Sequence, residues 1–111
     1  MTAAHYQLDN LIAFVDVNGF QNDGTTAETM LMEPLAEKWR AFRWNVLEVD
    51  GHDFKQLLGA IEDAQTCLQK PSVILCKTVK GKGISFMEHQ IKFHGFSLNE
   101  EQFQQAIDEL V

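Results

Sequence analysis

The chain has 111 residues, enough for one domain with a single modest core. Hydrophobic residues make up 45% and charged residues 23%, the proportions of an ordinary globular protein. The net charge of −7 argues against a nucleic-acid-binding surface, which needs clustered lysine and arginine. No apolar run approaches the roughly 20 residues of a membrane span, and the N-terminal residues lack the pattern of a signal peptide. We therefore expect no membrane partner and a cytoplasmic location.

The first half of the chain predicts a strand, a long loop, a helix and a second strand. Leu11–Val15 is apolar on both faces, as a short buried parallel strand is. Gly19–Leu31 is a polar loop, longer than a compact connection needs, which suggests a function. Pro34 is expected to open a helix at its first turn, and Trp44–Val49 reads as the second strand. Apolar residues fall on one face of that helix: Leu35, Trp39 and Phe42.

The second half predicts another helix, a third strand, a loop and a last helix. Asp53 is a good N-cap, and Ser72–Val79 reads as a strand that begins after Pro71. Lys80–Phe96 is a loop punctuated by glycines. The first helix should carry an apolar stripe of Phe54, Leu57, Leu58, Ile61 and Leu68. The last should be capped by Asn99 or Ser97 and carry Phe103, Ile107 and Leu110.

Alternation of strands and helices indicates right-handed β-α-β crossovers and therefore a parallel sheet. We expect an α/β fold, a partial three-layer parallel sheet of about three strands with flanking helices. So few strands leave an edge unpaired, which favours association into a homodimer or larger homo-oligomer. Cys67 and Cys76 lack disulfide or metal spacing, so both are expected to be reduced, buried thiols.

Three polar patterns are candidate ligand sites, and the first of them directly follows a predicted strand, where ligands bind in open α/β sheets. Asp16 and Asn18 could place an amide oxygen and a backbone carbonyl on Mg²⁺ beside a diphosphate, or could simply form an Asn-Gly turn. Lys80, with glycines after it, could approach phosphate oxygens or lie in a mobile basic loop. His94 could donate to phosphate or be merely solvated. Each pattern alone favours the simpler interpretation.

The order of these landmarks over nearly the whole chain is specific. They are Leu-Asp-Asn-Leu-Ile (8–12), Val-Asp-Val-Asn-Gly-Phe-Gln-Asn-Asp-Gly (15–24), Glu-Pro-Leu-Ala-Glu-Lys-Trp (33–39), Glu-Val-Asp-Gly-His-Asp (48–53), Lys-Thr-Val-Lys-Gly-Lys-Gly (77–83) and Phe-His-Gly (93–95). The sequence resembles the thiamine-diphosphate-binding half of transketolase, in particular its short, separately encoded N-terminal subunit. Residues 1–111 would then form part of that domain, the back half of the fold.

The resemblance assigns a role to each matching position. Asn18 matches the Asn that closes the thiamine motif and ligates Mg²⁺, and Phe20 matches the residue whose backbone carbonyl binds the same metal. Lys80 and His94 match residues placed near the cofactor's diphosphate. The implied cofactors are thiamine diphosphate and Mg²⁺. No residue of this chain is assigned a catalytic role.

The sequence also departs from the family pattern. The Gly-Asp-Gly that opens the motif is absent, and with it an aspartate that ligates Mg²⁺. Val17 replaces an Asn that is common in the family, and Asn22 stands where an aliphatic residue is usual. We therefore expect the isolated chain to be inactive in two-carbon ketol transfer between sugar phosphates. Its expected partners are its own copies or a complementing transketolase subunit that carries the pyrimidine-binding domain. A non-catalytic, self-associating remnant without cofactor is the alternative.

Overall fold

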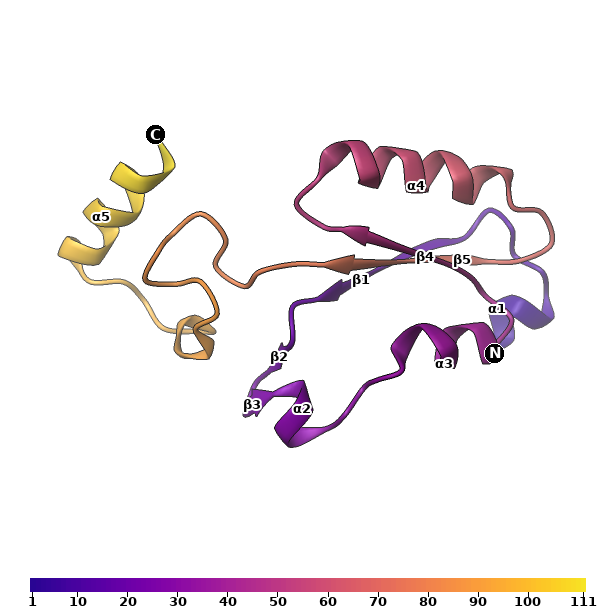
Figure 1. Ribbon diagram of the computed structural model, residues 1–111, viewed down its shortest axis with the longest axis horizontal. Coiled ribbons are helices and arrows are strands. Elements are labelled where there is room, and N and C mark those ends of the chain that lie inside the picture. The colour runs from indigo at the N-terminus through magenta and orange to yellow at the C-terminus, as the bar shows by residue number, and fades with distance from the viewer. The chain divides into compact units, whose positions relative to one another are not determined.

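A computed structural model describes every residue from Met1 to Val111. The chain divides into two compact units, each built from two segments. The sheet unit contains Met1–Val17 and Met32–Thr78, and the loop unit contains Asn18–Leu31 and Val79–Val111. Figure 1 shows the helices and strands of each unit. No helix is both long enough and apolar enough to cross a membrane.

The sheet unit contains three parallel strands, as the alternation of strands and helices predicted. β1 (Ile12–Val17), β4 (Asn45–Asp50) and β5 (Ser72–Lys77) lie in the order β1-β5-β4. β5 pairs in parallel with both neighbours, and residues Ser72 to Cys76 of this central strand are all buried. The α/β fold class expected from the sequence is thereby confirmed.

β1 differs from its prediction in position and in burial. It begins at Ile12 and continues to Val17, beyond the expected end at Val15. Phe14, in the middle of the strand, is 54% exposed. β1 pairs only with β5 and so lies at an edge of the sheet, where Ile12 is its one residue that packs against the core cluster of α4 and β5. The other two predicted strands are shifted or shortened by one or two residues at their ends.

Helix α4 (Phe54–Thr66) covers one face of the sheet. Asp53 caps it as predicted, since its side chain accepts the amide N–H groups of Lys55 and Gln56. The core cluster joins Ala60 of this helix to Ile74 and Cys76 of β5. Further apolar residues pack against this cluster: Ile12, Leu47, Val49, Leu57 and Ile61.

The predicted apolar stripe of α4 is therefore wrong in part. Leu57 and Ile61 face the core, but Phe54 is 80% exposed and Leu58 60% exposed. Leu68 lies beyond the end of the helix. The face that packs repeats at Leu57, Ala60, Ile61 and Ala64, a spacing of three or four residues, and the two small alanines let the helix approach the strands.

Helix α3 (Leu35–Ala41) lies on the other face of the sheet (Figure 1). It begins one residue later than predicted, so Pro34 occupies the N-cap position and not the first turn. The indole rings of Trp39 and Trp44 meet edge to face, with their centroids 4.9 Å apart. A short helix, α1 (Thr2–His5), precedes β1 and was not predicted.

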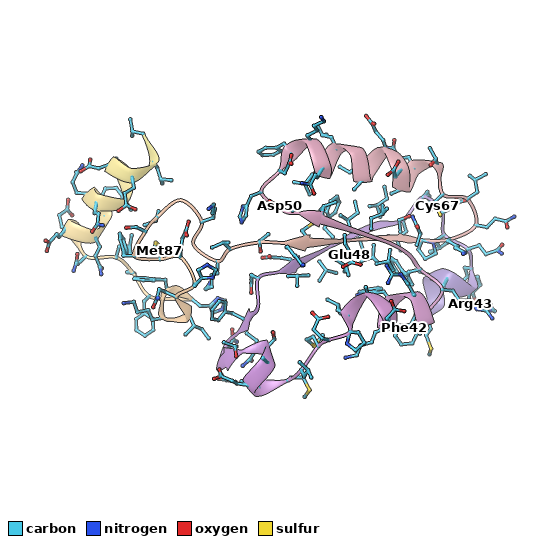
Figure 2. All side chains as sticks on the ribbon, in the orientation of Figure 1. Phe42, Arg43, Glu48, Asp50, Cys67 and Met87 are labelled. Atoms are coloured by element: carbon cyan, nitrogen blue, oxygen red, sulfur yellow. The ribbon has the colours of Figure 1, made fainter.

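The two cysteines are free, as expected, but differ in burial. Cys76 is buried in β5, and burial raises the pKa of its thiol, an effect to which the Asp16 carboxylate adds. Cys67 follows the last residue of α4 and is only half-buried (Figure 2). The expectation of two buried thiols holds for Cys76 alone.

The loop unit is more ordered than its sequence suggests. The predicted loop Gly19–Leu31 contains a small antiparallel pair, β2 (Phe20–Gln21) with β3 (Gly24–Thr25), and a turn of helix, α2 (Thr26–Thr29). Two further elements complete the unit: the 3₁₀ helix η1 (Ile91–Phe93) and helix α5 (Glu100–Leu110). Asn99, one of the two predicted caps, forms a reciprocal capping box with Gln102.

Candidate diphosphate and metal pocket

The loop unit contains a cavity of about 180 Å³. All four residues predicted for the cofactor and metal lie in its wall: Asn18, Phe20, Lys80 and His94. Three further residues complete the lining: Gln21, Asn22 and Ile91. Two segments far apart in the sequence, the β2–β3 region and the chain from Lys80 to His94, thus contribute to one cavity.

A tight turn shapes the Asn18 side of the pocket. The Phe20 amide donates to Asn18 Oδ1 over 2.9 Å, and Gly19 between them has a φ of +79°, which favours glycine. The Thr26 amide donates to the Gly19 carbonyl over 2.9 Å and ties the turn to α2. The turn and ligand interpretations of Asn18 do not exclude each other, because an amide side chain has two acceptor sites on its oxygen and two N–H donors.

A closed loop carries Lys80. The Lys80 carbonyl accepts the amide N–H of His89 over 3.0 Å, so the chain returns to Lys80 just before it enters η1. This return explains why Lys80 and His94 line the same cavity. No carboxylate lies within ion-pairing distance of the Lys80 ammonium, whereas the nearby Lys82 ammonium lies 3.4 Å from Glu88 Oε1.

The donor chemistry of the wall suits an anion with several oxygens. Gln21 Nε2 is buried and has no hydrogen-bond acceptor in the protein. A buried, unsatisfied N–H group is costly, and an acceptor brought by a ligand would remove that cost. The Lys80 ammonium and the His94 imidazole add donors of the kind that bind phosphate oxygens. The residues present therefore fit the diphosphate part of the implied cofactor.

The metal has a smaller set of ligands here. No group of three or more His, Cys, Asp or Glu side chains is arranged to hold an ion. Two residues of the pocket wall carry uncharged oxygen ligands: Asn18 through its side-chain amide and Phe20 through its backbone carbonyl. Mg²⁺ commonly takes such oxygens together with water and the phosphates of its ligand. Asn18 and Phe20 therefore fit two positions of a shared metal–diphosphate site and not a complete metal cage.

Asp16, considered with Asn18 in the sequence, is not among the lining residues. It belongs to the sheet unit, where the Thr78 hydroxyl donates a hydrogen bond to its carboxylate. Gln21 is the residue that sequence reasoning missed. Its strand has two residues, too short for a periodicity, and its only signal was its place between the motif residues Phe20 and Asp23.

Comparison with known proteins agrees with this fold. The family described as "transketolase, thiamine diphosphate binding domain" matches residues 1–110. The chain therefore belongs to the transketolase thiamine-diphosphate-binding domain family. Its fold is close to that of the transketolase of Campylobacter jejuni, with a TM-score of 0.89 and 30% identity over 97% of this chain and 17% of that one. Transketolase from Leishmania mexicana gives a TM-score of 0.85 and 31% identity over 95% of this chain and 16% of that one.

Two curated relatives are named as transketolase subunits. The 6-deoxy-6-sulfo-D-fructose transketolase subunit SqwG of Clostridium sp. is 46% identical over 99% of this chain and 40% of its own length. One of the subunits of the apulose-4-phosphate transketolase of Phocaeicola vulgatus is 36% identical over 99% of this chain and 39% of its own length. The chain thus spans about 40% of the length of these relatives.

Proposed function

We propose that this chain is the part of a transketolase subunit that anchors the diphosphate of thiamine diphosphate and its Mg²⁺. The observation that carries the proposal is the cavity in the loop unit, whose wall holds Asn18, Phe20, Lys80 and His94 together. Thiamine diphosphate, when bound, supplies the carbanion chemistry of two-carbon ketol transfer between sugar phosphates. The protein supplies binding and orientation.

Each residue has a distinct task in this proposal. The Asn18 side-chain oxygen and the Phe20 carbonyl bind the metal, with Asn18 held in place by the Phe20 amide 2.9 Å from Oδ1. Lys80 neutralises diphosphate charge, and it is available because no carboxylate pairs with it. His94 donates from its imidazole, and Gln21 offers the amide N–H group that otherwise has no acceptor.

The proposal includes a partner. The chain spans 40% of the length of a related subunit, and its matched residues belong to the thiamine-diphosphate-binding domain, so the proposed activity calls for a further domain. We propose that a complementing transketolase chain with the pyrimidine-binding domain supplies it, and that the isolated chain has negligible transketolase activity. Sugar phosphates are the substrates of that assembly. A cytoplasmic location stays a prediction from the sequence.

A non-catalytic, self-associating protein is the second candidate, and the sheet favours it. Both outer strands have an open edge, and Phe14 on β1 and Phe54 on α4 are more than half exposed. Exposed apolar groups and unpaired strands favour association of copies. In this second candidate function the chain forms a homodimer and needs no cofactor.

Isothermal titration of the full chain with thiamine diphosphate, with and without Mg²⁺, separates the two candidates. The first predicts Mg²⁺-dependent binding that Asn18→Ala weakens and that Lys80→Met weakens with or without the metal. Lys70→Met, which removes a lysine of the sheet unit, is the matched control and should bind as the wild type does. Wild-type protein that binds no cofactor at millimolar concentration, yet forms a dimer by light scattering, would favour the second candidate.

A further inference from the structure

The loop that carries Lys80, residues 79–90, is held together by its own backbone. Besides the bond between the Lys80 carbonyl and the His89 amide, the Lys82 amide donates to the Val79 carbonyl over 3.2 Å. The Ile84 amide donates to the Gly81 carbonyl over 3.2 Å. The loop is thus a chain of tight turns, and the place of Lys80 depends on those turns staying closed.

One side chain fastens the middle of this loop. Glu88 Oε1 accepts the amide N–H of Gly83 over 3.1 Å and lies 3.4 Å from the Lys82 ammonium. The amide of Glu88 itself donates to the Ile84 carbonyl over 3.0 Å. The pKa of the Glu88 carboxyl is lowered, first by the hydrogen bond from the Gly83 amide, so the ionised form is the one that the loop stabilises. Glu88 does not line the pocket.

The same contact distinguishes two lysines of one loop. Lys82 and Lys80 are two residues apart, but only Lys82 has a carboxylate partner. Glu88 therefore occupies Lys82 and leaves Lys80 as the cation of the pocket wall. A carboxylate inside the cavity would repel a diphosphate. The Glu88 carboxylate is not part of the pocket lining, and its contacts are with the Gly83 amide and the Lys82 ammonium of the 79–90 loop.

We propose that Glu88 is a positioning residue of the diphosphate pocket, which keeps the 79–90 loop in the conformation that presents Lys80. The inference rests on the proposed function for the identity of the ligand. It concerns a residue that would touch neither cofactor nor substrate and would act through the Gly83 amide and Lys82. Its role is therefore separable from that of the residues in the wall.

Three variants of the full chain test the proposal. Glu88→Ala removes the acceptor and the charge, Glu88→Gln keeps an oxygen for the Gly83 amide, and Lys82→Met removes only the ion pair. Amide hydrogen exchange at Gly83 and His89 reports loop closure. Titration with inorganic pyrophosphate and Mg²⁺ reports the pocket. Glu62→Gln, an exposed carboxylate on α4 in the sheet unit, is the control for loss of one negative charge.

We expect Glu88→Ala to speed exchange at Gly83 and His89 and to weaken pyrophosphate binding about tenfold, the effect of losing one hydrogen bond to a charged group. Glu88→Gln should restore binding to within about threefold of wild type, and Lys82→Met should change it by about twofold or less, because exposed ion pairs contribute little. Thermal unfolding followed by far-UV circular dichroism should stay the same within a few degrees in all variants.

Two results would overturn the inference. The first is Glu88→Ala that exchanges and binds as the wild type does. The second is that Glu88→Gln and Lys82→Met both weaken pyrophosphate binding as much as Glu88→Ala does. The ion pair with Lys82, and not the hydrogen bond from the Gly83 amide, would then be responsible. Wild-type protein that binds neither pyrophosphate nor the cofactor contradicts the proposed function instead. In that case exchange at His89 still decides whether Glu88 closes the loop.

Discussion

Gly81→Ala should open the loop that carries Lys80, and the structure allows the size of the effect to be worked out. A Cβ at Gly81 would lie 2.6 Å from the Met87 carbonyl carbon and closer still to its oxygen, on the same loop (Figure 2), and the residue has a φ of +75°. Gly19 has nearly the same φ, +79°, but nothing lies within 4 Å of its Cβ position. Gly19→Ala is therefore a matched control that carries the backbone strain without the overlap.

Alanine at such a φ strains the folded backbone by about 1–2 kcal/mol. Alanine also lowers the conformational entropy of the unfolded chain, which offsets about 0.4–1 kcal/mol of that cost. Gly19→Ala should therefore destabilise its own turn by about 1 kcal/mol. At Gly81 the added Cβ would also overlap backbone atoms of Met87, which cannot move away as a flexible side chain can. This overlap adds about 1–3 kcal/mol to the destabilisation. An extra 2 kcal/mol or so corresponds to about a thirtyfold larger population of the open loop.

Amide hydrogen exchange at His89 measures this population directly, because that amide bonds the Lys80 carbonyl. We expect Gly81→Ala to speed exchange there by about thirtyfold or more and Gly19→Ala to leave it within about twofold. Equal rates at His89 in the two variants would refute the reasoning, since the contact with Met87 would then have no energetic consequence.

Three other predictions concern the core, the pH dependence and the pocket. Ile74→Ala should lower the free energy of unfolding by about 2–5 kcal/mol in urea titration, because this fully buried side chain belongs to the core cluster; a loss below about 1 kcal/mol would contradict that packing. The pKa of Glu109 is lowered, first by the amide of Ser85, so its contribution is present above the ordinary value of 4.5 and is lost as the pH falls through the lower folded value. The protection factor of the Ser85 amide, which corrects its exchange rate for the intrinsic slowing in acid, should therefore fall as the pH falls, and this dependence should be absent in Glu109→Gln. Gln21→Glu should abolish pyrophosphate binding by adding a carboxylate to the wall, whereas Gln21→Leu should weaken it by about tenfold or less; titration that ranks them otherwise would contradict an anion site.

The sequence predicted which elements form but not which of them are neighbours. Local periodicity located three strands and the capped helix after Asp53, and their alternation predicted parallel pairing. The position of β5 in the centre depends on pairing between distant segments, which no local pattern encodes. β1 lies at an edge in that order, and the exposure of Phe14 on it was not predicted.

The same limits apply to helix α4 and to the pocket. Phe54 and Leu58 are apolar and were expected inside, but the face that packs is completed by Ala60 and Ala64, whose small side chains give a weak hydrophobic pattern. The four wall residues were placed together by resemblance to a family. The unsatisfied amide of Gln21 became visible only in three dimensions, because whether a donor lacks an acceptor depends on everything folded around it.

The contact between Trp39 and Trp44 has an optical consequence. Both indoles and Tyr6 belong to the sheet unit, and no other tryptophan or tyrosine exists in the chain. Tryptophan fluorescence therefore reports the folding of the sheet unit. The loop unit, which contains Lys80, has no tryptophan of its own. Ile91→Trp would give the loop unit its own fluorescent reporter. Unfolding of the sheet unit and of the loop unit could then be followed separately.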